Sequence, residues 1–98
     1  MLAFYVYILR CSDGSFYVGH TDNIDVRISQ HKQGVFVNCY TYTRRPVELV
    51  YVETFGTRDE AFAAERQIKG WTRRKKMALI NKEFELLKYL ARRKNRKE

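Results

Sequence analysis

The spacing of apolar residues predicts two strands at the start of the chain and a third strand further on. Residues 3–10 and 47–55 are rich in β-branched and aromatic side chains, which favours strands. Asp13 and Gly14 form a turn signal before residues 15–19, so we expect a hairpin here. Apolar residues occur on both faces of residues 47–55, which predicts a strand covered on both sides and central in its sheet.

Helical periodicity and capping residues predict the remaining elements. Helices are expected over residues 24–32, 58–69 and 73–81, and Gly34 and Gly70 end the first two. A last amphipathic helix should turn four apolar residues inward: Phe84, Leu87, Leu90 and Ala91. This order predicts an α/β protein of the α+β kind, with a small, mainly antiparallel sheet flanked by helices.

Length and charge limit the class of protein. The 98 residues suit one domain, and no apolar run is long enough to cross a membrane. The net charge of +8 is uneven, because residues 1–65 carry a net −2 and residues 66–98 a net +10. This asymmetry favours a polyanionic partner, nucleic acid, at the C-terminal end, although a solvated basic surface would give the same composition.

The start of the chain and the cysteines predict a cytoplasmic protein. Residues 2–9 are apolar, but no basic segment precedes them and no small-residue cleavage site follows, so they indicate a strand rather than a signal peptide. Cys11 and Cys39 have no metal-binding spacing and no secretory context. We expect reduced thiols, with a disulfide as the alternative.

Glu65 is a carboxylate within an apolar helical stripe. It follows Ala61 by four residues and precedes Ile68 by three, so it shares their face of the helix. A carboxylate in this position must be paired, protonated or bound to a metal ion. A salt bridge to an arginine is the structural explanation. The functional one is a single ligand for Mg²⁺, which often takes only one or two carboxylates.

Two phenols, a guanidinium and an imidazole could act on a phosphate near that carboxylate. Tyr7 and Tyr17 lie on strands that a hairpin would pair, and a phenol can relay a proton or position a water. Arg27 and His31 are one helical turn apart, and they suit phosphate binding and general base catalysis. Taken singly, each residue also has a structural explanation in packing or at the surface.

The combination of these residues resembles the GIY-YIG nuclease superfamily. Residues 5–7 read YVY and residues 17–19 read YVG, followed by Arg27 and Glu65. More closely, the chain resembles the small single-domain bacterial branch of UPF0213-like proteins, over about residues 4 to 80.

The resemblance assigns roles to single residues. It implies that Tyr7, Tyr17 and Arg27 are catalytic, that Glu65 binds the metal, and that His31 matches a tyrosine or histidine four residues after the arginine. There are two departures. The leading glycine of the first motif is a tyrosine in this chain, and His20 stands where some relatives have a phosphate-binding lysine.

The same resemblance implies a fold and a reaction. We expect a three-stranded antiparallel sheet with flanking helices, a nuclease domain over residues 1–82, and a C-terminal helix and basic tail of the same domain over residues 83–98. The expected reaction is hydrolysis of DNA, rather than RNA, phosphodiesters with one Mg²⁺ or Mn²⁺ ion. Relatives include a DNA-excision-repair subunit and resolvases of branched DNA.

The basic segment after Glu65 is the predicted nucleic-acid contact. With His20, it supplies these residues: Lys69, Arg73, Arg74, Lys75 and Lys76. No base-reading helix is evident, so we expect selection of nucleic-acid structure rather than sequence. The alternatives are a domain that binds nucleic acid without cutting it, and an adaptor whose protein partner supplies targeting.

Overall fold

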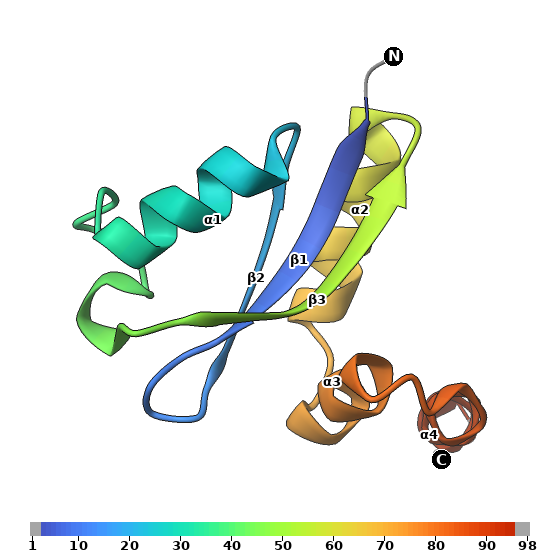
Figure 1. Ribbon diagram of the computed structural model, residues 1–98. Helices are drawn as coiled ribbons and strands as arrows, with labels where there is room; N and C mark the ends of the chain where they lie inside the picture. The colour runs from blue at the N-terminus through green and yellow to red at the C-terminus, as the bar shows by residue number, and fades with distance from the viewer. Residues whose placement is uncertain (1–2, 96–98) are drawn as a thin grey trace.

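The computed structural model describes residues 3–95 as an antiparallel sheet of three strands with helices on both faces (Figure 1). The strands lie in the order β2-β1-β3. The elements are β1 (Phe4–Arg10), β2 (Phe16–Thr21), α1 (Ile24–Gln33), the 3₁₀ helix η1 (Tyr42–Arg44), β3 (Glu48–Phe55), α2 (Arg58–Lys69), α3 (Arg73–Ile80) and α4 (Phe84–Asn95). The predicted fold class is confirmed. Within residues 3–95, no helix has the length and apolarity that crossing a membrane requires.

The hairpin of β1 and β2 fixes the positions of the site residues. Gly14 adopts a φ of 84°, and the Asp13 carboxylate accepts a hydrogen bond from the backbone N–H of Ser15 at 3.0 Å. The resulting register pairs Tyr7 with Gly19 and Leu9 with Tyr17. The two phenols and the glycine therefore lie on one face of the sheet, as the period of two along a strand requires.

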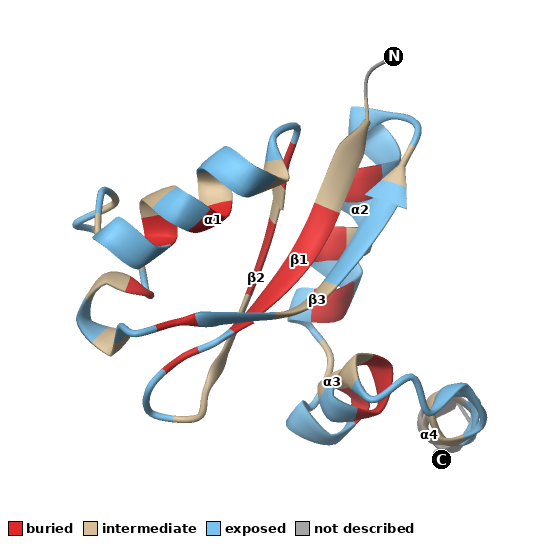
Figure 2. Cartoon of the chain, in the orientation of Figure 1, coloured by how far each residue is buried: buried red, intermediate tan, exposed pale blue. Residues whose placement is uncertain are grey.

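The two faces of β1 enter two separate apolar cores. One core joins Val6, Ile8 and Val18 to α2 and α3 through Ala61, Ile68 and Leu79. The other joins Tyr7, Leu9 and Cys11 to Ile28 of α1 and to Val47. Figure 2 shows the middle of β1 as buried between these helices. The strand predicted over residues 3–10 is confirmed as β1.

The strand predicted over residues 47–55 is confirmed as β3, but its predicted central position was wrong. β1 is the central strand, and β3 lies at an edge and pairs only with β1. Leu49 and Val52 are exposed, and much of β3 is drawn as exposed in Figure 2. The helix α1 packs over β1 and β2 and leaves this face of β3 open. Apolar residues on both faces therefore marked a half-covered edge strand rather than a central one.

The helices predicted over residues 24–32, 58–69 and 73–81 are confirmed as α1, α2 and α3. The side chains of Asn23, Thr57 and Thr72 cap α1, α2 and α3, and Gly34 ends α1 with a φ of 75°. In α4, Leu87 packs against the α2-side core, whereas Phe84 is exposed, so its predicted inward direction was wrong. Phe84 is the first residue of α4 and is 52% exposed. The tail after residue 95 lies outside the described residues.

Candidate active site

Three side chains of the predicted site meet on the α1 face of the sheet. The Tyr7 hydroxyl lies 2.9 Å from Nε2 of His31, with which it forms a buried hydrogen bond. The Tyr17 ring centre lies 6.3 Å from that of Tyr7 and 5.2 Å from that of His31. The strands β1 and β2 supply the two phenols, and α1 supplies the imidazole four residues after Arg27, so three elements build one cluster.

Gly19 makes room for this cluster. A Cβ atom at this position would lie 2.5 Å from the Tyr7 hydroxyl and 3.2 Å from Cε2 of Tyr17. Because β2 is an edge strand and Tyr7 is paired with Gly19, the phenol crosses the glycine backbone toward the open edge of β2. A side chain here would displace the phenol, which is a steric reason for glycine in the YVG motif.

Arg27 adds a positive charge to the cluster. It is half-buried on α1, and its guanidinium lies 5.4 Å from the centre of the Phe36 ring. Burial raises the pKa of Tyr7 to about 12, and a hydrogen bond from Arg27 acts in the opposite direction. Burial and then the charge of Arg27 lower the pKa of His31. At neutral pH the phenol is therefore protonated and the imidazole neutral.

His31 is fully buried, and its second nitrogen reaches a residue that the sequence analysis missed. Nδ1 lies 2.9 Å from the hydroxyl of Thr41, which is 1% exposed. Thr41 also donates to Sγ of Cys39 at 3.5 Å. Both residues belong to the irregular loop between α1 and η1, where no periodicity distinguishes a buried polar residue from a surface one.

Glu65 approaches β2 from the α2 face of the sheet, whereas the phenols lie on the α1 face. It is buried on α2, where Oε1 accepts a hydrogen bond from Nδ1 of His20 at 2.6 Å and Oε2 lies 3.0 Å from Nζ of Lys69. Burial is the main cause of the raised pKa of Tyr7 and of Tyr17, and the charge of Glu65 makes only a minor contribution in the same direction. The carboxylate and the phenols therefore interact electrostatically around β2.

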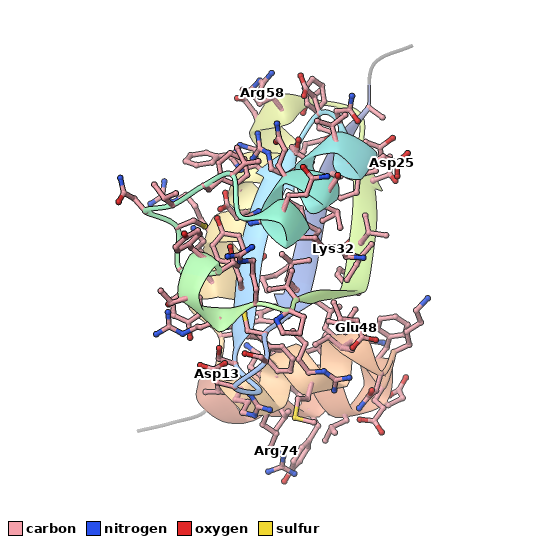
Figure 3. All side chains as sticks on the ribbon, turned by 60° about the vertical axis from the view of Figure 1, so that its left-hand side comes forward. Asp13, Asp25, Lys32, Glu48, Arg58 and Arg74 are labelled. Atoms are coloured by element: carbon pink, nitrogen blue, oxygen red, sulfur yellow. The ribbon has the colours of Figure 1, made fainter. Side chains whose placement is uncertain are left out.

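The residues predicted to contact nucleic acid are in different environments. His20 and Lys69 are the partners of Glu65. Arg73 donates to the backbone oxygen of Gly14 at 2.7 Å and so ties α3 to the hairpin turn. Lys75 is buried, with Nζ 4.6 Å from the centre of the Trp71 ring. Arg74 is exposed and points away from the sheet (Figure 3), and Lys76 is half-buried.

Comparison with known proteins decides the family. The model of the GIY-YIG catalytic domain matches residues 3–78. The chain belongs to the GIY-YIG family. The UPF0213 protein of Staphylococcus aureus strain Mu50 is 46% identical over 76 residues, which are 78% of this chain and 92% of that protein. The sequence resemblance is therefore confirmed, and the family is one of nucleases that act on nucleic acid.

Two solved structures have this GIY-YIG fold. The UPF0213 protein of Bacillus halodurans is 42% identical, with a TM-score of 0.54, over 81% of this chain and 83% of that one. A protein of E. faecalis is 41% identical, with a TM-score of 0.58, over 86% of this chain and 88% of that one. The aligned part of each chain includes most of the fold that positions the site.

Proposed function

We propose that this GIY-YIG protein is a divalent-metal-dependent endonuclease that selects DNA by structure rather than by sequence. The observation that carries this proposal is the buried hydrogen bond between Tyr7 and His31, with Tyr17 and Arg27 beside it and Glu65 on the far side of β2. Within this region, the two tyrosines and His31 can accept or donate a proton, and Arg27 can bind a phosphate.

The donor set suits a hard cation with few protein ligands. Members of this nuclease family typically need a divalent metal. Among residues 3–95, no group of three or more His, Cys, Asp or Glu side chains could hold one. Glu65 alone would therefore hold a single Mg²⁺ or Mn²⁺ ion, which keeps water as its other ligands. When bound, the ion polarises the phosphate and offsets the charge of the leaving oxygen.

Lys69 occupies one oxygen of that carboxylate in the structure. Its ammonium group is half exposed and sits on a flexible stem, so it can leave Glu65 for solvent or for a DNA phosphate. A cation on Oε2 would take over the charge that Lys69 now supplies. His20 would stay on Oε1 and orient the carboxylate, in the manner of other hydrogen-bonded metal ligands.

The remaining side chains would carry the proton and the charge. A water lined up with the phosphate loses its proton to Tyr7, and His31 accepts the phenolic proton in turn. Arg27 binds the phosphate and stabilises the charge that builds up during attack. Tyr17 packs against the rings of both Tyr7 and His31 and holds the phenol over Gly19.

DNA binding is proposed to use the exposed cations rather than base contacts. Arg74 on α3 and Lys69 on α2 are exposed, and neither lies on a helix built to enter a groove. Phosphate contacts of this kind give affinity without sequence preference. Targeting to a site would then come from the shape of the DNA or from a protein partner.

A cleavage assay on several DNA structures tests this function. The whole chain is mixed with single-stranded, duplex and branched DNA, with Mg²⁺, with Mn²⁺ and with a chelator. We expect cleavage only with metal and fastest on branched or single-stranded DNA. Binding to these DNAs without cleavage under any metal would reject the enzyme and support a binding domain.

That second candidate has one observation in its favour. Both oxygens of Glu65 are satisfied by His20 and Lys69, so the carboxylate is stable in the fold without any metal ion. A domain that binds nucleic acid and has lost cleavage would keep these contacts. Calorimetric titration with Mn²⁺ separates the two candidates, because only the enzyme needs an ion on Glu65.

A further inference from the structure

The His31 ring is hydrogen-bonded at both nitrogens. Nε2 lies 2.9 Å from the Tyr7 hydroxyl, and Nδ1 lies 2.9 Å from the Thr41 hydroxyl. Because burial and then Arg27 lower the pKa of this ring, it carries a single proton at neutral pH. One nitrogen therefore donates and the other accepts, and the neighbouring groups decide which.

The neighbours of Thr41 show that its oxygen accepts from the ring. Thr41 has one hydroxyl proton and donates it to Sγ of Cys39 at 3.5 Å. Burial alone would raise the pKa of the Cys39 thiol, but hydrogen bonding with Thr41 and Tyr17 and with the backbone holds that pKa below its ordinary value. The sulfur is thus the acceptor at the end of the chain of hydrogen bonds, which leaves Thr41 only its lone pairs for His31.

At the Tyr7 end of this series, the hydrogen bonds run in the same direction. The guanidinium of Arg27 has donors only, so the Tyr7 oxygen accepts from it, and the phenolic proton is free to point to Nε2. We infer that Thr41 is a positioning residue: it holds the His31 proton on Nδ1 and so leaves Nε2 free to accept the proton of Tyr7.

This arrangement completes the proton path of the proposed reaction. The O–H bond of Tyr7 breaks as an N–H bond forms at Nε2 of His31, and the phenolate takes a proton from the attacking water. The resulting imidazolium keeps the proton on Nδ1, and this N–H group donates a hydrogen bond to the oxygen of Thr41. With the opposite tautomer, Nε2 would already carry a proton and could accept none. The effect on cleavage rests on the proposed function, whereas the tautomer itself does not.

Nitrogen NMR of the intact chain tests the tautomer without any substrate. The chain has only two histidines, so long-range ¹H–¹⁵N spectra contain two rings, and a His20→Asn variant assigns them. At a pH where His31 is neutral, we expect Nδ1 to show the shift of a protonated nitrogen and Nε2 that of an unprotonated one. The reverse assignment in the wild-type protein would overturn the inference, and this result needs no variant to fold.

Variants at Thr41 test what the tautomer does. Thr41→Val keeps the shape and loses the acceptor, so we expect the His31 proton to move to Nε2 and cleavage to slow about 10- to 100-fold. Thr41→Ser keeps a hydroxyl group, so we expect it to restore both the proton on Nδ1 and the cleavage rate. Thr43→Val is the matched control, because Thr43 is exposed on the adjoining η1 and should change neither.

The outcomes separate this inference from the proposed function. A folded Thr41→Val protein that keeps its proton on Nδ1, or that cuts at the wild-type rate with the proton moved, overturns the positioning role. A wild-type protein with the Nδ1 proton that cuts no DNA rejects the nuclease and leaves the hydrogen-bond assignment intact.

Discussion

At the scale of single residues, the identity of Gly19 is set by a side chain of the neighbouring strand. Its backbone has an ordinary extended conformation, so glycine is not needed for a positive φ. What requires glycine is the phenol of Tyr7, which lies where a Cβ atom would be. The glycine of the second motif (YVG) therefore leaves room for Tyr7 of the first motif (YVY).

Gly19→Ala should consequently destabilise the fold and disturb the site. The new methyl group forces the buried phenol or the strand to shift, and overpacking of this kind costs about 1–3 kcal/mol. Chemical denaturation measures the free energy of unfolding. Gly56→Ala is the control, because the nearest side-chain atom to its Cβ would lie 4.0 Å away. Equal stability of the two variants would contradict the steric explanation.

His31 should make the stability of the protein depend on pH. Burial and then Arg27 lower its folded pKa, so the unfolded chain binds more protons than the folded one as the pH falls below about 6.5. The stabilisation by the neutral ring is complete above that pH and is lost through the acidic range. Denaturation of wild type and His31→Gln across this range should show a steeper loss in wild type. Parallel curves would mean that the ring titrates normally.

The sequence could predict the site residues that lie on regular elements. The turn signal placed Tyr7 and Tyr17 on the two strands of one hairpin, and helical spacing placed Arg27 beside His31 and Glu65 on an apolar face. Thr41 and its contact with His31 could not be predicted, because no period relates a loop residue to a helix ten positions earlier.

At the scale of elements, α2 determines how available the carboxylate is. Lys69 lies four residues after Glu65, so the helix itself brings the ammonium group to Oε2. The sequence predicted only a nucleic-acid contact for Lys69. The i,i+4 spacing was a visible signal for an ion pair, and it gives Lys69 a second role as a competitor of the metal.

Lys69→Met should therefore raise the affinity for Mn²⁺. Loss of a half-exposed ion pair is worth up to about 1 kcal/mol, which corresponds to about two- to fivefold in affinity. Calorimetric titration without DNA measures this effect directly. Arg66→Met removes the same charge from the same helix without a contact to Glu65 and should change the affinity less. If Arg66→Met raised the affinity for Mn²⁺ by as much or more, the increase would come from the net charge and not from the loss of the ion pair with Glu65.

The error over β3 also belongs to this scale. A strand with apolar residues on both faces was expected to be central, but β3 lies at an edge of the sheet. Coverage depends on where α1 packs, and α1 packs on β1 and β2. The pattern within residues 47–55 contains no information on that packing.

At the scale of the whole molecule, the candidate site spans two faces of one thin sheet. Because β2 is an edge strand, groups from α1 and from α2 can approach each other around it. We propose that α4 is part of this same domain, since its Leu87 packs on the α2-side core. The excess of basic residues lies at the α3 and α4 end, away from α1 (Figure 1).

This charge distribution predicts how DNA binding responds to salt. Affinity should fall linearly on a log–log plot, and each phosphate contact contributes about 0.9 to the slope. Arg74→Ala should reduce the slope by about 1. Arg58→Ala is the control, because Arg58 lies at the opposite end of the molecule (Figure 3). Fluorescence anisotropy at several salt concentrations gives the slopes, and an unchanged slope for Arg74→Ala would remove it from the interface.

The measurement that tests the central claim most directly is the single-turnover cleavage rate of branched DNA with Mg²⁺ or Mn²⁺, for wild type, Arg27→Ala and Lys32→Ala. Both variants remove one positive charge from α1, but only Arg27 reaches Tyr7. We predict that the wild type and Lys32→Ala cut at similar rates and that Arg27→Ala, with an unchanged unfolding temperature, is about 10²- to 10³-fold slower. Arg27→Ala cutting at the wild-type rate, or a wild type that cuts with neither metal, would contradict the account.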